Sequence, residues 1–230
     1  MDFSETEDQI MIRDMVRDFA ETVASPTCHQ RDKEQKPPID EFKQFAELGV
    51  AGMTIPETYG GQKLDDISEA IVIEELSRVD PSLGVMVAVH VGLCSMTITL
   101  NGSEEQKNKY LPKLASGEYL GAYSLSEAGS GTDAAAMVAR ASEDGDFYTL
   151  NGEKMWVTNG TTADLFVLFA KVTDHPDYGE KKHGGVTCFV IEKGFKGFKI
   201  GKKEDKLGIR SSDTCTLILD NCKVPKENVL

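Results

Sequence analysis

The feature that most constrains the fold is a change of sequence pattern near Ser116, about midway along the 230 residues. Before it, apolar side chains recur at helical spacing, for example at Ile12, Met15 and Phe19. After it, runs of β-branched and aromatic residues are separated by Gly, Asn and Asp, and no helical pattern alternates with them. A helical half followed by a strand-rich half predicts an α+β chain whose second part is mainly antiparallel, as a barrel or a sandwich.

We therefore expect two domains, an α-helical one over residues 1–117 and a β-barrel one over residues 118–230. The longest apolar stretch, Leu83–Leu100, is interrupted by glycines and polar residues. It predicts a buried helix rather than a membrane span.

Local signals place several elements within these domains. Ser4 with Glu7, and Ser103 with Gln106, have the spacing of capping boxes that begin helices. Asn151-Gly152 predicts a hairpin turn, because both central positions of that turn need positive φ. The predicted strands are Tyr119–Leu125, Met137–Ala141, Phe147–Leu150, Lys154–Thr158, Leu165–Val172, Val186–Ile191 and Cys215–Leu219.

Charge and composition exclude several classes of function. The formal net charge of -13 argues against binding to nucleic acid or to an anionic membrane. The five cysteines form no C-x-x-C pair, which indicates reduced thiols in a cytoplasmic protein. The first residues lack the pattern of a signal peptide. The four histidines have no metal-ligand spacing, so no metal site is expected.

One stretch whose residues could bind a ligand runs from Ala122 to Asp133, AYSLSEAGSGTD. Its glycines let the backbone approach a ligand closely, and successive N–H groups and hydroxyls can form a small anion nest. Such a nest suits a pyrophosphate on an acidic protein. The stretch is not a Rossmann fingerprint, because the third glycine and the βαβ unit are missing. A plain glycine-rich hairpin loop is the alternative.

The second stretch, Asn151–Gly160, contains the only tryptophan, Trp156, followed by Thr158 on the same face of a strand. An indole can cover one face of a planar cofactor while a hydroxyl reaches a ring heteroatom. A core tryptophan beside a turn is the alternative.

Together the two stretches resemble the acyl-CoA dehydrogenase family, whose members read A-Y-x-L-T-E-P-x-A-G-S-D and N-G-x-K-x-W-I-T-N-G. Lys206–Thr214 is similar to the family's K-x-G-x-R-x-S-x-T, and Val224–Leu230 to its V-P-x-E-N-x-L. The order and spacing agree along the whole chain, and the short-chain, butyryl-type branch is the most similar. Ala128 departs from the usual proline, Ser130 from alanine, and Thr132 from serine with its hydroxyl kept.

The resemblance implies FAD as cofactor and an acyl-CoA thioester as substrate. Thr158 would lie near flavin N5, and Thr132 near both the pyrophosphate and the CoA arm. Leu93 and Met96 would form walls of the acyl pocket, although both also suit a plain core. The implied cofactor-binding residues are Tyr123, Leu125, Ser126, Gly131, Thr132, Trp156 and Thr158.

The implied reaction is FAD-dependent α,β-dehydrogenation of an acyl-CoA in fatty acid metabolism, by an oxidoreductase acting on a CH–CH bond. The family's catalytic base lies in a C-terminal four-helix bundle after the barrel, and we expect that bundle to be absent here. No residue is therefore assigned as catalytic. The resemblance also implies a homotetramer, with an electron-transfer flavoprotein as electron acceptor.

Two hypotheses follow from the expected absence of that domain. In the first, the chain is a truncated part of a larger dehydrogenase, which its finish on Asn228-Val229-Leu230 favours. In the second, it is a natural partial homologue that binds flavin or a partner protein without turnover. An interaction protein without any cofactor is a third alternative. In each case this chain alone is expected to lack the base.

Overall fold

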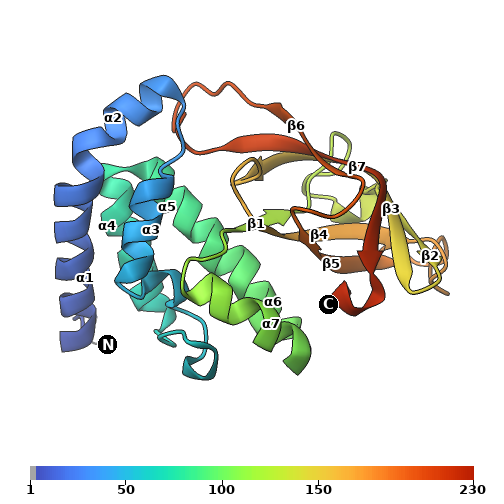
Figure 1. Ribbon diagram of the computed structural model, residues 1–230, viewed down its shortest axis with the longest axis horizontal. Coiled ribbons are helices and arrows are strands. Elements are labelled where there is room, and N and C mark those ends of the chain that lie inside the picture. The colour runs from blue at the N-terminus through green and yellow to red at the C-terminus, as the bar shows by residue number, and fades with distance from the viewer. Residues whose placement is uncertain (1–3) are drawn as a thin grey trace.

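Seven α-helices precede seven β-strands in the computed structural model, which describes residues 4–230 (Figure 1). The helices are α1 (Glu7–Phe19), α2 (Ser25–Glu34), α3 (Ile39–Glu47), α4 (Asp66–Val79), α5 (Pro81–Ala88), α6 (Met96–Asn101) and α7 (Glu104–Ala115). The strands are β1 (Gly121–Ser124), β2 (Arg140–Asp144), β3 (Phe147–Thr158), β4 (Leu165–Val172), β5 (Val186–Glu192), β6 (Phe198–Lys203) and β7 (Thr214–Pro225). The predicted α+β class, with the helical part first, is confirmed.

Helices begin where side chains can accept the free backbone N–H groups of the first turn. The capping box predicted at Ser103 and Gln106 is present at the start of α7. The first capping box was predicted wrongly at Ser4 and Glu7. It lies two residues later, where Thr6 accepts from the Gln9 backbone and the Gln9 side chain reaches back.

The predicted apolar helix is the longest helical unit, running from Pro81 to Asn101 through α5, a π-helical segment (Val89–Ser95) and α6. Asp80 caps its start by accepting from the backbone N–H groups of Ser82 and Leu83. Its length and composition would suit a membrane span, but half of its apolar window is buried inside the protein. Core helices of proteins that contact no membrane share these properties, and this one packs between the other helices and β1.

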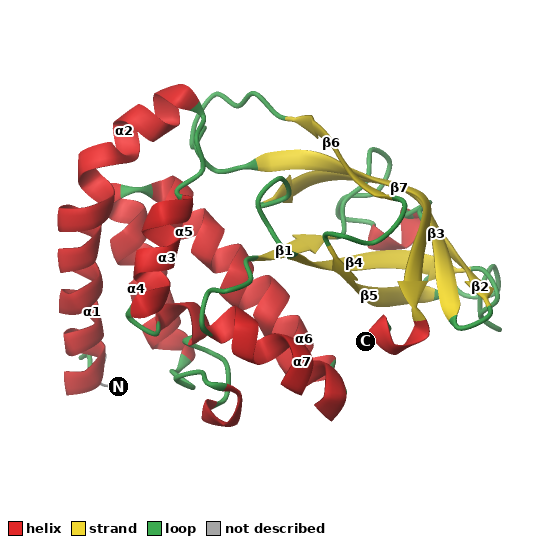
Figure 2. Ribbon diagram, in the orientation of Figure 1, coloured by secondary structure: helices red, strands yellow, loops and turns green. Residues whose placement is uncertain are grey.

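The strands form one curled mixed sheet beside the helices (Figure 2). Its order is β1-β4-β2-β3-β7-β6, and β5 pairs with β4. Four of the pairings are antiparallel, while β1 and β2 both run parallel to β4. The sheet is therefore mainly antiparallel, as predicted, with a parallel minority that the sequence pattern did not indicate.

The hairpin turn predicted at Asn151-Gly152 is wrong. β3 continues through both residues, and the chain reverses at Gly145, where φ is +60°. Asn151 and Gly152 mark a β-bulge instead, where Asn151 Oδ1 accepts from the Asn221 backbone. Glycine is needed at 152 because a Cβ there would lie 2.8 Å from Ala139 Cα.

The helical part and the sheet share one apolar core. Buried His90 joins them: its Nδ1 accepts from Gly121 N at 3.0 Å, and its Nε2 lies 3.1 Å from the Leu114 carbonyl oxygen. On the other side, Arg210 N donates to Asp32 Oδ1 of α2 at 2.6 Å. The strands that carry the candidate site are thus fixed against the long helix.

Candidate functional site

A hollow of about 220 Å³ lies between the π-helical segment and the ends of β1 and β3. It brings together six of the residues predicted for the site: Leu93, Tyr123, Leu125, Ser126, Trp156 and Thr158. Val89 and Met155 complete its lining. A π-helical turn within an α-helix is frequent at functional sites, because it displaces the side chains on one face.

Three of the predicted residues lie outside this lining. Gly131 and Thr132 are exposed in the loop that follows Ser126. Met96 is half-buried, almost one turn beyond Leu93 on the same helix. The hollow thus joins the two sequence stretches at one end, and the glycine loop extends from it.

Trp156 occupies an unusual backbone position at the edge of the hollow. The register between β3 and β7 shifts between Lys154 and Val157, which makes a β-bulge. Within it Trp156 has φ of +56°, and 62% of the residue is exposed. Positive φ is an outlier for a bulky residue, and both strained backbone and bulges cluster at functional sites.

The same bulge ties the two stretches together. Met155 N does not pair with β7 but donates to Ser126 O at 2.9 Å. The bulge therefore re-aims Trp156 and also fixes the strand end beside Ser126.

A buried ion pair lies beneath the glycine loop. Lys154 Nζ is 2.6 Å from Glu127 Oε1, and the two side chains are 0% and 4% exposed. Lys154 also donates to Leu125 O, and Glu127 accepts from the backbone N–H groups of Val138 and Ala139. Burial lowers the pKa of Lys154. Glu127 therefore braces backbone N–H groups and does not line the hollow.

The loop above this pair has a tight internal frame. Glu127 and Ser130 exchange backbone hydrogen bonds of 2.9 and 3.1 Å, and Ser130 Oγ donates to Asp133 O at 3.0 Å. Neither Gly129 nor Gly131 has positive φ, and a Cβ on either would meet nothing within 4 Å. Packing within the described chain therefore does not require glycine at these positions, which leaves room for a close approach by another molecule.

Asn159 and Asp213 hold the chain directly after the end of β3, and sequence reasoning missed both. Asn159 is buried with φ of +64°, and its Nδ2 donates to Met86 O and Gly121 O. Asp213 Oδ2 accepts from both the backbone and the hydroxyl of Thr161, each at 2.6 Å. Only the family-like patterns around these two residues could have drawn attention to them.

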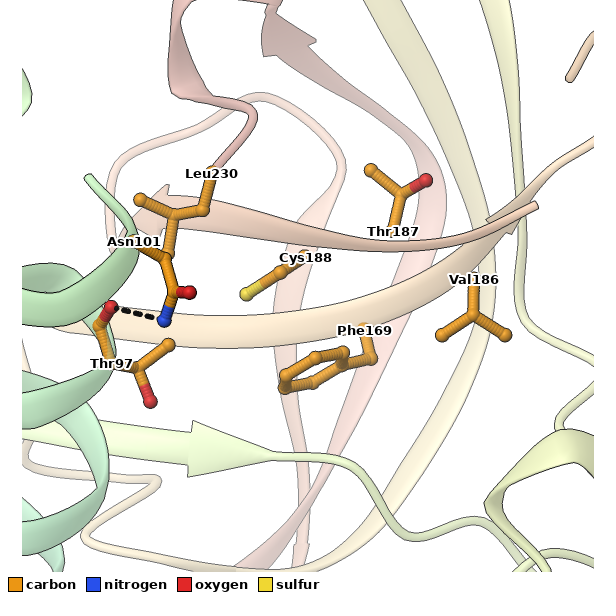
Figure 3. A pocket seen from close by; sticks show the side chains of 7 residues that line it. All are labelled: Thr97, Asn101, Phe169, Val186, Thr187, Cys188 and Leu230. Carbon is orange, nitrogen blue, oxygen red and sulfur yellow. Dashed lines mark hydrogen bonds between the residues drawn. The ribbon is translucent and has the colours of Figure 1, made fainter. Parts of the chain in front are cut away.

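A second hollow of about 330 Å³ lies between α6 and strands β4 and β5 (Figure 3). The Tyr123 and Phe169 rings, 5.4 Å apart, link the two hollows, because Tyr123 lines the first and Phe169 the second. The lining residues Val89, Leu93, Thr97 and Asn101 follow at intervals of four along one helix face, which therefore passes both hollows. The second hollow is lined by Thr97, Asn101, Phe169, Val186, Thr187, Cys188 and Leu230.

Across residues 4–230, no carboxylate lines the first hollow. Glu75, a nearly buried carboxylate elsewhere in the helical part, pairs with Arg17 and Arg13, and these contacts lower its pKa to about 2. Glu74 likewise pairs with Arg13. In the same described range, no group of His, Cys, Asp and Glu has the arrangement of a metal site.

Comparison with known proteins gives matches along the whole chain. The model of the acyl-CoA dehydrogenase N-terminal domain matches residues 6–118, and that of the acyl-CoA dehydrogenase middle domain matches residues 122–222. The short-chain specific acyl-CoA dehydrogenase of Clostridium acetobutylicum is 44% identical over 230 residues. The alignment covers 100% of this chain and 59% of that protein, so the chain spans little more than half of its relative.

Two solved structures agree with it. Butyryl-CoA dehydrogenase from Megasphaera elsdenii superposes with a TM-score of 0.92 at 37% identity, over 100% of this chain and 60% of that one. An acyl-CoA dehydrogenase from Bacillus anthracis, complexed with FAD, gives 0.89 at 37% identity, over 99% and 38%.

Proposed function

Because this chain belongs to the acyl-CoA dehydrogenase family, we propose that it forms the FAD-holding part of an enzyme that dehydrogenates short acyl-CoA thioesters. The chain supplies the flavin site and part of the acyl-CoA site. The base that removes the α proton is not assigned to any of its residues, since no carboxylate of the described range lines the hollow.

The observation that carries the proposal is the position of Trp156. Trp156 is 62% exposed on a strained bulge, and Thr158 and the apolar Leu93 line the same hollow. An exposed indole on a strained backbone is unfavourable unless something covers it, and a planar aromatic ring system is the natural cover. Thr158 then supplies the hydroxyl for a ring nitrogen. The mixed apolar and hydroxyl lining fits a flavin, and the Bacillus anthracis relative was solved with FAD.

The glycine loop fits the pyrophosphate of the same cofactor. Gly131 and Thr132 are exposed next to the hollow, and open space faces Gly129 and Gly131. Backbone N–H groups and the Thr132 hydroxyl can hold an anion there without a lysine or arginine. The Ser130 hydroxyl is engaged with Asp133 and is not part of this set.

The acyl-CoA thioester is assigned to the helix face that passes both hollows. Leu93 is 43% exposed at the first hollow, and Met96 lies three residues further along the same helix, outside the lining of either hollow. Because one stripe of side chains borders both hollows, an elongated ligand can lie along it beside the flavin. Similarity to a short-chain specific dehydrogenase supports a short acyl group.

When bound, FAD would accept the hydride that leaves the β carbon of the acyl group. The residues of this chain bind and orient it: Trp156 covers a ring face, and Thr158 donates a hydrogen bond. Leu93 and Leu125 reduce access of water to the reacting carbons. The Lys154–Glu127 ion pair, which lies beneath the glycine loop, keeps the backbone of that loop in place.

Three further assignments complete the proposal: the location rests on the cysteines, and the assembly and the electron acceptor rest on the family. We place the protein in the cytoplasm with reduced cysteines, as part of a homotetramer that passes electrons to an electron-transfer flavoprotein. The five cysteines are free thiols in the structure, and burial raises the pKa of Cys188 and Cys215 to about 12.

The test is thermal unfolding with added dinucleotides. FAD at about 100 times its Kd stabilises a protein by about 2.7 kcal/mol. For a chain of this size that raises Tm by about 5–10 °C. NAD⁺ at the same concentration should leave Tm unchanged. No flavin absorbance in the purified protein, together with no FAD-dependent shift, would contradict the proposal and favour a partner-binding protein. Butyryl-CoA should then stabilise the FAD-loaded chain further, and free butyrate should not.

A further inference from the structure

The chain makes a sharp turn directly after Thr158. Asn159 has φ of +64°, and Ala163 N donates back to Asn159 O at 2.7 Å. Gly160 is packed so closely that a Cβ there would lie 2.4 Å from Cys215 Sγ. The direction in which β3 ends, and with it the Thr158 side chain, therefore depends on how this turn is held.

Asp213 holds the turn at two points. Its carbonyl oxygen accepts from Asn159 N at 2.9 Å. Its carboxylate Oδ2 accepts from Thr161 N and from Thr161 Oγ1, both at 2.6 Å. Asp213 directly precedes Thr214, the β7 partner of Thr158, so it spans the gap between the two strand ends.

These contacts are made inside the protein. Asp213 is 0% exposed, and the charge of Lys206 acts on it from nearby. The two Thr161 bonds need an acceptor at this position, because a side chain without one would leave Thr161 N and Oγ1 unsatisfied. A buried acceptor at the start of β7 thus ties the turn after β3 to the neighbouring strand.

We propose that Asp213 is a positioning residue for the cofactor site: it fixes the turn after β3, and thereby the Thr158 hydroxyl and the Trp156 indole. Its action on FAD rests on the function proposed above; its action on Trp156 does not. Asp213 touches neither, since it lies outside the lining of the hollow. Its effect passes through Thr161 and Asn159.

The geometry also predicts which substitutions are tolerated. Asp213 Oδ1 has no hydrogen-bond partner, whereas Oδ2 has both Thr161 bonds. In Asp213→Asn the amide oxygen can take the place of Oδ2, and the NH₂ group the place of Oδ1. Asp213→Ala removes the side-chain acceptor and keeps only the backbone bond from Asn159 N. A role in positioning therefore predicts rescue by asparagine but not by alanine.

The experiment uses Trp156, the only tryptophan, as a probe in the chain without cofactor. Acrylamide quenching of its fluorescence and the Kd for FAD are measured for Asp213→Ala, Asp213→Asn and Asp65→Ala. Asp65 is the matched control, because its carboxylate also accepts a backbone N–H, at the start of α4 and away from the hollow. Asp213→Ala should change the quenching constant and weaken FAD binding by up to about tenfold, because a displaced Thr158 hydroxyl loses its hydrogen bond to the cofactor. Asp213→Asn should resemble the wild type in both. Asp65→Ala should lower Tm with neither change.

Wild-type quenching and wild-type FAD affinity in Asp213→Ala would overturn the inference. Equal changes in Asp65→Ala would overturn it too, because they would show a general loss of stability. If Asp213→Ala does not fold, Thr161→Val removes one of the two bonds and must shift quenching in the same direction; no shift would overturn the inference. If the wild type binds no FAD, the proposed function fails, while the quenching comparison still decides the role of Asp213.

Discussion

Lys154 and Glu127 form a 2.6 Å ion pair whose two side chains are almost completely buried beneath the glycine loop. The pair connects three backbone segments, because Lys154 also binds Leu125 O and Glu127 binds the N–H groups of Val138 and Ala139. The loop that we assign to the cofactor is thus held from inside the protein, and its outer surface stays open.

Breaking this pair should be far more damaging than breaking an exposed one. Lys154→Met leaves the Glu127 carboxylate buried without its cation, and should lower the free energy of unfolding by about 3–5 kcal/mol. Adding Glu127→Gln should recover part of this loss, because the amide oxygen still accepts a backbone N–H. Urea denaturation measures both. The control is Lys181→Met, whose exposed pair with Asp177 should contribute less than about 1 kcal/mol. Equal losses in the two single variants would contradict this role.

Trp156 should matter for the cofactor and little for stability. Because the residue is 62% exposed, Trp156→Ala should change the free energy of unfolding by about 0.5 kcal/mol or less. The Kd for FAD should rise by the equivalent of about 1 kcal/mol or more, and Trp156→Phe should recover part of it. Isothermal titration and urea denaturation separate the two effects. A loss of about 3–5 kcal/mol in stability with unchanged FAD binding is the result expected of a core tryptophan, and would remove Trp156 from the site.

Thr158→Val tests the hydroxyl that we place near flavin N5. Valine keeps the β-branched shape, so Tm should stay close to that of the wild type, while the flavin midpoint potential should shift. Spectroelectrochemical titration measures the potential. Thr216→Val, on β7 and outside the hollow, is the matched control and should leave the potential unchanged. An unchanged potential in Thr158→Val would exclude this placement.

His90 should make the fold sensitive to mild acid. Burial lowers the pKa of His90 from 6.5 to about 4. As pH falls below 6.5 the unfolded chain binds a proton at this histidine, while the folded chain stays neutral until about pH 4. The free energy of unfolding should therefore decrease as pH falls through this window, by about 2 kcal/mol between pH 7 and pH 5.

Urea denaturation at several pH values measures this slope. The comparison is with His90→Gln, which cannot titrate and should show a flatter dependence. Equal slopes in the two proteins would show that His90 does not cause it.

Local signals predicted much of the helical half. Ser103 and Gln106 cap α7 because capping depends on neighbours in sequence. The hairpin turn predicted at Asn151-Gly152 was wrong for the opposite reason. Pairing with β7 kept β3 continuous, and the local preference of the two residues produced a bulge. Strand β6 was missed because its lysines hide the alternation of an edge strand.

The candidate site likewise contains residues that local sequence predicted and residues that it did not. Residues within the two conspicuous stretches, such as Trp156 and Ser126, do meet in one hollow. Asp213 and Lys154 were missed because their importance lies in partners distant in sequence, and charged residues in a sequence are usually solvated. Apart from the family-like patterns around them, only three-dimensional contacts distinguish them.

The central claim is that this chain holds FAD against Trp156. The most direct measurement is an equilibrium titration of the purified chain with FAD, followed by quenching of its tryptophan fluorescence, since Trp156 is the only emitter of this kind. The account predicts saturable quenching with one FAD per chain, weakened in Thr158→Val or Asp213→Ala and absent with NAD⁺. Emission that FAD leaves unchanged, or that falls linearly with FAD concentration without saturating, would contradict it.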